Sequence, residues 1–461
     1  MNQKKNVLLF NVFFLLLLII ATFLFEWKPD LLGANFHPIN ILADVQIDSL
    51  QSSDSISTGT TADLVKSDSV VRVGNKIIII RDYTSYAGLV NSAGKEYPLQ
   101  SFLQSLSGLK KHTRKKVRIA YFGDSFIEGD LITQDLRKQL QDTFGGNGVG
   151  FVPITSIVAG FRQTITQGFS KDWNDVSFKS DDKADANLFV SGHSFFSDAN
   201  SWVNYHTVDR PHLNFFNNVA ILYGIPTADK PPTATITVND KQQAITAAQE
   251  FNETDFIFDS IKNVRVSVSS KDIPMYGAAF ESNEGIYVDN FSFRGITGVE
   301  FNYFDTAFLA QVQKTRPYDL LIFQYGPNLL FRPNLSDFSW YIKKMQPVLK
   351  KITTAFPQTS ILLVSTADKD FNYDGSAWTT EKGVQPLVDG QYQMARSANI
   401  DFFNLFHAMG GANSLVNWVE GDTTYANKDY THVNSRGGKR IAGYLYNAIM
   451  KDYNDFEKHT D

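Results

Sequence analysis

The chain has 461 residues, and its 43 Lys and Arg against 48 Asp and Glu give a formal net charge of −5. A slightly acidic chain lacks the basic balance of a nucleic-acid-binding protein, so no nucleic-acid partner is expected. The absence of cysteine excludes disulfides, thiolate metal sites and a cysteine nucleophile. With 43% hydrophobic and 20% charged residues, the composition is that of a folded globular protein, and the length allows about three domains.

The N-terminal segment is strongly apolar over residues 7–25. A helix of that length spans about 28 Å, close to the hydrocarbon thickness of a bilayer. Lys4 and Lys5 precede it, which favours a cytoplasmic N-terminus and an exported body. A cleaved signal peptide is the alternative, but bulky residues stand where cleavage needs small ones. We therefore expect an anchor within residues 1–27, in a bacterial-type cytoplasmic membrane, with the body on the periplasmic side.

Residues 28–69 are rich in Ser, Thr and Asp without sustained periodicity, which predicts a flexible linker. The folded body begins near residue 70. An apolar strand over residues 117–122 runs directly into Gly123-Asp124-Ser125, and a helical pattern follows over residues 131–144. Strand, tight turn and helix in this order are typical of an open α/β sheet. Ligands bind at the carboxyl ends of the strands in such sheets, so Ser125 lies where chemistry is expected.

Residues 151–290 have a different pattern, with short β-rich runs separated by turn clusters and no helices between them. This spacing predicts an all-β sandwich. Helix and strand patterns alternate again afterwards, with helices expected at residues 301–312, 338–356, 381–398 and 435–453 and strands at 319–324 and 360–365. The fold class predicted is therefore α/β: one domain built from residues 70–150 and 291–461, interrupted by an inserted β-sandwich at 151–290.

Four short motifs carry side chains suited to catalysis. They are Gly123-Asp124-Ser125, the glycine turn from Arg294 to Gly298, Gly326-Pro327-Asn328 after a strand, and Asp429-Tyr430-Thr431-His432 before the last helix. The spacing of the last motif lets the Asp carboxylate reach the Nδ1–H of the His, which would orient that ring as a general base. Taken singly, each motif has an ordinary structural interpretation as a helix cap, a turn or a surface pair.

Taken together and in this order, the motifs resemble the four sequence blocks of the SGNH (GDSL) hydrolase family. The resemblance covers residues 117–154 and 285–453. The extended first block, residues 123–130, and the glycine-rich stretch 145–152 are similar to those of periplasmic peptidoglycan O-acetylesterases, as is Met409-Gly410-Gly411. Those enzymes carry a β-sandwich, carbohydrate-module-like domain between the first two blocks. The resemblance implies a three-layer, flavodoxin-like parallel sheet.

The resemblance also implies roles for individual residues. Ser125 would be the nucleophile, His432 its general base and Asp429 the residue that orients His432. The oxyanion hole would combine the backbone N–H groups of Ser125 and Gly298 with the side-chain amide of Asn328. Neither a cofactor nor a metal ion is expected.

The predicted function is that of an exported, membrane-anchored serine esterase of carbohydrates. It would remove O-acetyl groups from peptidoglycan or another envelope or extracellular glycan, so its partners would be an acetylated glycan and, through residues 7–25, the membrane. Two alternatives stay open. One is an O-acetyltransferase, because Pro327, Leu329 and Leu330 make the pocket wall beside Asn328 more apolar than is usual in the family. The other is a glycan-binding protein with a vestigial triad.

Two further patterns resemble metal sites but do not meet the requirements of one. Residues 370–381 match the letter pattern of an EF-hand calcium loop, but a strand is expected just before them where an EF-hand needs a helix. His193, His206 and His212 lack metal-ligand spacing. Several aromatic residues of the insertion could stack on sugars, but a core role is the favoured interpretation for Trp202, Tyr205, Phe215 and Phe216.

Overall fold

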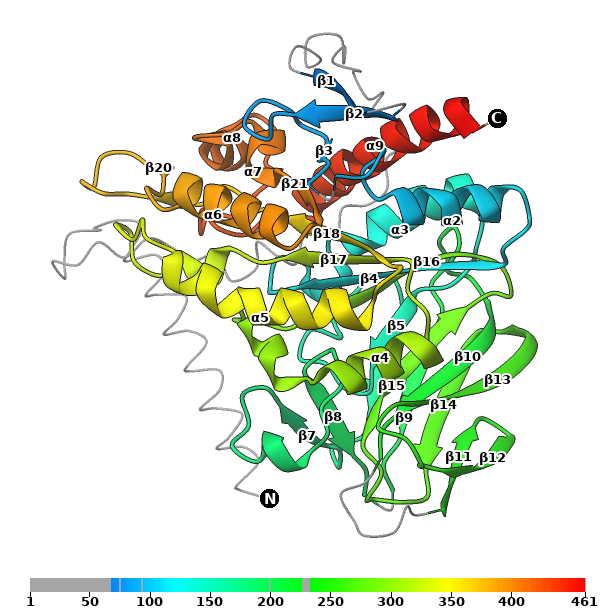
Figure 1. Ribbon diagram of the computed structural model, residues 1–461. Helices are drawn as coiled ribbons and strands as arrows, with labels where there is room; N and C mark the ends of the chain where they lie inside the picture. The colour runs from blue at the N-terminus through cyan, green and yellow to red at the C-terminus, as the bar shows by residue number, and fades with distance from the viewer. Residues whose placement is uncertain (1–67, 74–75, 93, 199, 226–232, 461) are drawn as a thin grey trace, which may run out of the picture. The chain divides into compact units, whose positions relative to one another are not determined.

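The computed structural model describes residues 68–73, 76–92, 94–198, 200–225 and 233–460 (Figure 1). The predicted anchor, residues 1–27 with the apolar run 7–25, lies outside the described residues. So does the predicted linker, apart from residues 68 and 69. None of the helices in the described ranges combines the length and the apolar character that a membrane span requires.

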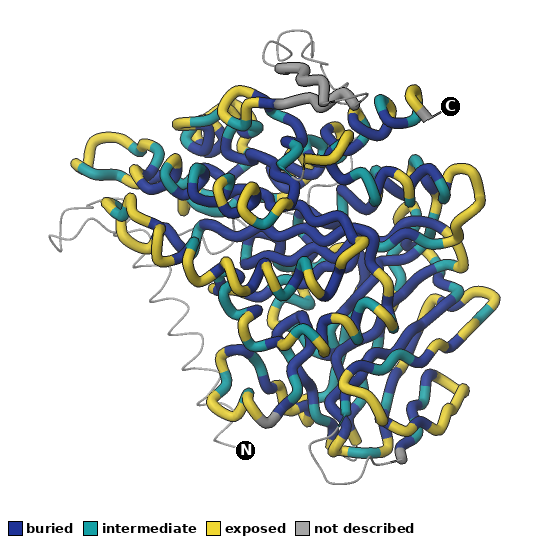
Figure 2. The backbone as a smooth tube through the Cα atoms, viewed as in Figure 1, coloured by how far each residue is buried: buried dark blue, intermediate teal, exposed yellow. Residues whose placement is uncertain are grey.

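A six-stranded sheet lies at the centre of the α/β domain. Its strands, in spatial order, are β16 (Gly285–Ser292), β4 (Lys116–Gly123), β17 (Leu320–Gln324), β18 (Ser360–Val364), β21 (Asp401–Phe403) and β3 (Leu89–Val90). All neighbouring pairs are parallel except β21 and β3. Every residue of β17 and β18 is buried, as expected for parallel strands covered on both faces (Figure 2).

Helices cover both faces of this sheet, so the domain has three layers (Figure 1). Ile119 and Tyr121 of β4 pack on one side and Ala120 and Phe122 on the other, because side chains alternate along a strand. The first side is covered by α2 (Gln100–Lys110), α3 (Thr133–Phe144) and α9 (Ser435–Thr460), and the second by α4 (Thr306–Thr315), α5 (Ser339–Ala355) and α6 (Val384–Ser397). The predicted three-layer α/β architecture is confirmed.

Shorter elements connect these layers. They are β1 (Asp68–Val73), β2 (Lys76–Arg81), the 3-10 helices η3 (Glu128–Asp130), η4 (Lys183–Asp185), η5 (Val299–Tyr303) and η6 (Pro327–Leu329), the hairpin β19 (Asp370–Phe371) and β20 (Thr379–Thr380), α7 (Leu405–Met409) and α8 (Ser414–Glu420). The helix predicted at 301–312 is divided into η5 and α4. Asp305 causes the division, because its side chain accepts the N–H of Phe308 and caps α4.

The insertion consists of two antiparallel sheets whose inner faces share one apolar cluster. One sheet has the order β13 (Asn252–Ile261), β10 (Phe216–Tyr223), β15 (Met275–Glu281), β8 (His193–Phe196) and β7 (Asn174–Ser177), with β5 (Gly150–Pro153) paired to β15. The other has the order β12 (Lys241–Thr246), β11 (Thr233–Val238), β14 (Asn263–Val268), β9 (Val203–His206) and β6 (Thr166–Phe169). Tyr205 and Phe216 have no exposed surface, so the core interpretation is confirmed for these two aromatics.

The predicted C-terminal boundary of the insertion at residue 290 is wrong. Residues 285–290 belong to β16, which pairs in parallel with β4 from Gly285 opposite Lys116 to Ser292 opposite Gly123. Seven of its eight residues are buried, and such an apolar strand looks the same in sequence whichever sheet it joins. Only its long-range pairing assigns it to the central sheet. The strands of the insertion therefore run from β5 to β15, and 151–290 is not a self-contained lobe.

A buried ion network joins the insertion to the central sheet. Arg316 has no exposed surface, and it donates from Nε to Asp289 Oδ2 at 3.0 Å and from Nη2 to Glu281 Oε1 at 2.5 Å. Glu281 lies on β15 of the insertion, and it also accepts from Arg118 Nε on β4 at 2.8 Å. Burial opposes ionisation of Glu281, but Arg118 and Arg316 hold its pKa well below the usual range. The network therefore fixes the angle at which the two parts meet.

We predict that Arg316→Met destabilises the protein by about 3–5 kcal/mol, the usual cost of leaving buried charges without their partner. The matched control is Lys138→Met, which removes the exposed ion pair with Asp142 and should cost no more than about 1 kcal/mol. Urea unfolding of both variants measures the difference. Equal losses in the two variants would show that the buried network does not hold the joint.

Candidate active site

Ser125 lies immediately after β4, at the carboxyl edge of the central sheet. The strand ends at Gly123, where a Cβ atom would come within 2.9 Å of the Ile127 side chain and 3.1 Å of the Gln324 carbonyl oxygen. The turn is closed by Asp124, whose buried carboxylate accepts the N–H of Phe126 at 2.9 Å. The chain reverses within these few residues and leaves the Ser125 side chain half-buried at the rim.

His432 reaches Ser125 from the loop between α8 and α9. Its Nε2 lies 3.0 Å from Ser125 Oγ, and its Nδ1 lies 2.7 Å from Asp429 Oδ2. The other Asp429 oxygen accepts the backbone N–H of His432 at 2.9 Å. An ionised carboxylate only accepts hydrogen bonds, so Nδ1 carries the hydrogen and Nε2 is left to accept the Ser125 hydroxyl proton. The structure thus brings the three residues of the predicted triad into one hydrogen-bonded chain.

Asp429 and His432 each stabilise the charged form of the other. The hydrogen bond to Asp429 raises the pKa of His432 above its ordinary value, although burial opposes the shift. Burial would raise the pKa of Asp429, but the hydrogen bonds from His432 outweigh it and lower that pKa. The side chains of His432 and Asp429 are 37% and 48% exposed, so water can reach the imidazole.

Tyr430 fixes the conformation of the loop that carries His432, a role that the sequence pattern did not predict. Its backbone is left-handed, with φ 52°, a conformation that costs a non-glycine residue about 1–3 kcal/mol. Three contacts offset that cost. Its ring stacks on Trp378 with centroids 4.0 Å apart, its hydroxyl donates to Glu420 at 2.7 Å, and its carbonyl accepts the N–H of Asp370 at 3.1 Å. A backbone conformation of this kind leaves no mark in the residue pattern.

The three predicted oxyanion-hole donors differ in their availability. In the described part of the chain, the N–H groups of Ser125 and Gly298 have no hydrogen-bond acceptor. Gly298 has φ 89°, and a Cβ there would lie 2.8 Å from the Tyr325 ring, so glycine is required. Asn328 Nδ2 donates to Asp124 Oδ2 and to the Ile296 carbonyl, each at 3.0 Å. Both of its amide hydrogens are thus engaged, and Asn328 ties the glycine turn to the turn that carries the nucleophile.

Asp124 is the second residue that the sequence analysis left without a role. Burial raises its pKa to about 6, against hydrogen bonds from Phe126 and Asn328 that favour the ionised form. Its carboxylate contacts both the Ser125 turn and the Asn328 amide, so it couples the two halves of the site. The sequence feature that could have indicated a role for Asp124 is its position directly before Ser125 in the first motif.

The residues of the calcium-loop pattern do not converge. Asp374 accepts hydrogen bonds from the backbone and hydroxyl of Ser376 in its own loop. Asp370 is buried, and this burial, together with the charge of Asp368, raises its pKa to about 8. A carboxyl group that is protonated at neutral pH is a poor cation ligand. The residues that the structure describes contain no group of three or more His, Cys, Asp or Glu arranged to hold a metal ion.

Comparison with known proteins gives an informative likeness to a solved structure. No protein-family model and no curated protein matches the chain. A solved peptidoglycan O-acetylesterase matches with a TM-score of 0.66 and 19% identity, covering 80% of this chain and 99% of that one. This likeness shows the fold. The predicted resemblance to peptidoglycan O-acetylesterases is therefore confirmed for the fold.

Two other solved structures match more weakly. A family two carbohydrate esterase from Cellvibrio japonicus has a TM-score of 0.26 at 10% identity, covering 63% of this chain and 98% of that one. An acetyl xylan esterase has a TM-score of 0.27 at 16% identity, covering 36% and 80%.

We predict that Asp429→Asn lowers the pKa of His432, because an amide cannot supply the negative charge that stabilises the imidazolium. NMR titration of the His432 ring measures this shift. Asp142→Asn is the matched control, because it removes the carboxylate beside a different histidine, His212. An unchanged His432 titration in Asp429→Asn would contradict the coupling.

Proposed function

We propose that this protein is an exported carbohydrate esterase that removes O-acetyl groups from peptidoglycan or another envelope or extracellular glycan. The observation that carries the proposal is the hydrogen-bonded chain from Ser125 through His432 to Asp429 at the carboxyl edge of the sheet. The fold adds support, because a protein of the same fold is a peptidoglycan O-acetylesterase.

The geometry supports an acyl-enzyme mechanism. Ser125 Oγ attacks the acetyl carbonyl carbon while His432 Nε2 takes the hydroxyl proton. The negative charge that develops on the carbonyl oxygen would be met by the N–H groups of Ser125 and Gly298. When the intermediate collapses, the bond to the sugar oxygen breaks and His432 donates its proton to that oxygen. Asp429 stays ionised throughout and stabilises the imidazolium.

The second half of the reaction requires water. A water molecule attacks the acetyl-Ser125 carbonyl, His432 takes its proton, and acetate leaves as Ser125 recovers its hydrogen. The exposure of His432 gives water access to the base, which favours hydrolysis. Of the three residues that kept a transferase open, only Pro327 is partly exposed beside Asn328. Leu329 and Leu330 are buried in the core beneath the site, with 0% and 1% of their surface exposed.

We expect the wild-type protein to release free acetate from O-acetylated peptidoglycan at a rate that added unacetylated glycan does not change. Ser125→Ala should lower this rate by more than about 10⁴-fold, because it removes the attacking oxygen. Lys138→Gln, a change at an exposed helix position, is the control that should keep full activity. The rate should rise with pH as His432 loses its proton, with a midpoint above the ordinary histidine value of 6.5.

Two outcomes would contradict the proposal. Accumulation of acetyl groups on the added glycan, with little free acetate, would identify a transferase. Wild-type rates in a folded Ser125→Ala protein would remove the mechanism.

The proposed function also implies a location for the protein in the cell. We propose that residues 7–25, which lie outside the described residues, hold the protein in the cytoplasmic membrane with the catalytic body on the periplasmic side. The full chain should then stay in the membrane fraction after a carbonate wash, whereas a chain lacking residues 1–27 should be released. Recovery of a soluble mature form beginning near Glu26 would instead identify a cleaved signal peptide.

A further inference from the structure

Two exposed cationic side chains from different parts of the chain meet beside the catalytic residues. Arg294 lies on the segment that leads from β16 to Gly298, and Lys179 follows β7 of the insertion. A Cβ atom built on Gly295 would lie 3.2 Å from Lys179 Nζ, so this ammonium group lies against the backbone next to Arg294. The insertion thus delivers a positive charge to the segment that carries a predicted oxyanion-hole residue.

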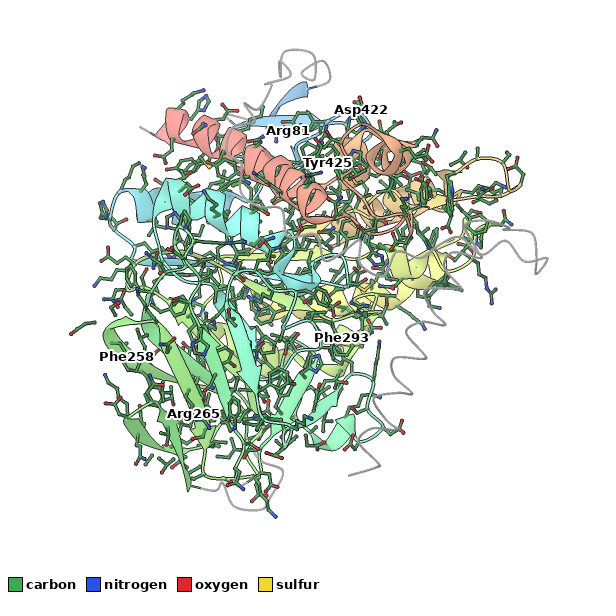
Figure 3. All side chains as sticks on the ribbon, turned by 180° about the vertical axis from the view of Figure 1, so that it is seen from behind. Arg81, Phe258, Arg265, Phe293, Asp422 and Tyr425 are labelled. Atoms are coloured by element: carbon green, nitrogen blue, oxygen red, sulfur yellow. The ribbon has the colours of Figure 1, made fainter. Side chains whose placement is uncertain are left out.

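Packing holds Lys179 in this place. Its neighbour Phe178 is buried, and its ring lies 5.4 Å from Phe293 and 5.7 Å from Phe304 of the catalytic domain, centroid to centroid. Phe293 lies where the inserted strands meet the catalytic domain (Figure 3). The Lys179 ammonium also lies 5.6 Å above the Phe293 ring. Because Phe178 is enclosed by aromatic side chains, the backbone that carries Lys179 is packed against the catalytic domain.

Arg294 is held close to the nucleophile. Its Nε and Nη2 both donate to Oε2 of Glu128, at 2.9 and 2.5 Å. Glu128 in turn donates its backbone N–H to the carbonyl of Ser125. The Arg294 side chain is 59% exposed, and its Nη1 has no partner among the described residues. One edge of the guanidinium is therefore open to a ligand bound at the mouth of the site.

The charged side chains around Arg294 and Gly295 carry more positive than negative charge. Glu128 neutralises Arg294, but Lys179 has no carboxylate within ion-pair distance in the described part of the chain. Lys179 therefore leaves one unpaired positive charge beside Gly295, in a chain whose overall charge is −5. An open guanidinium edge and an ammonium group suit a planar carboxylate, which carries a single charge. A phosphate monoester would bring up to two negative charges to one surplus cation.

We infer that the substrate is an acidic glycan, in which the acylated sugar or its neighbour carries a carboxylate that Lys179 and Arg294 bind. This inference rests on the proposed esterase function and narrows its substrate class. Binding of a group that does not react would hold the acetyl ester against Ser125, which converts binding energy into orientation. It also assigns a role to the insertion, which completes the substrate site by supplying Lys179.

The experiment uses the full chain and two matched probes, O-acetylated methyl glucuronoside and the corresponding glucuronamide, which has the same shape without the charge. We expect the wild-type kcat/KM for the acid to exceed that for the amide by about tenfold, the usual effect of one charge-assisted hydrogen bond. Lys179→Gln should bring this ratio close to one, and Lys179→Glu should reverse it. Raised salt should lower the wild-type ratio, because the side chains are exposed.

The control is Lys262→Gln, which removes an exposed lysine at the turn between β13 and β14 of the same insertion and should keep the wild-type ratio. Equal rates on the acid and the amide in the wild type, or an unchanged ratio in Lys179→Gln, would overturn the inference and leave the esterase proposal standing. Release of acetate from neither sugar would overturn the inference, and an equal lack of release from O-acetylated peptidoglycan would overturn the esterase proposal as well.

Discussion

The arrangement of this protein depends on one buried ion network. Glu281 lies on the last strand of the insertion and Asp289 on the next strand of the central sheet, and Arg316 binds both without any contact with water. A buried charge without its partner costs several kcal/mol, so these strands can satisfy one another in only one arrangement. Because β16 continues into Arg294 and Gly298, the same network fixes the segment that carries part of the site.

The site joins segments that are far apart in the sequence at one edge of the sheet. Parallel strands place all their carboxyl ends together, so the turn after β4, the glycine turn after β16 and Asn328 after β17 become neighbours. His432 comes from a loop instead, and it needs separate support. The contacts of Tyr430 with Trp378 and Glu420 supply that support, because they hold the loop in shape despite the left-handed backbone at Tyr430.

Most of the fold and of the candidate site could be predicted from local patterns. Strand, turn and helix around Ser125 follow from short-range periodicity, and the spacing from Asp429 to His432 already lets the two side chains meet. The layers of the sheet follow from the alternation of apolar strands and helices. Local patterns could not assign β16 to its sheet, because a buried strand has the same composition in either sheet.

The amino-acid sequence by itself determined the kinds of secondary structure, the order of the motifs and the residues able to form a triad, because each depends on neighbours within a few positions. Only the tertiary structure decided which groups are available for catalysis or for substrate binding. It engaged both amide hydrogens of Asn328, buried Leu329 in the core and placed Lys179 against Gly295. These outcomes depend on contacts between residues distant in the sequence, and periodicity along the chain carries no information about such contacts.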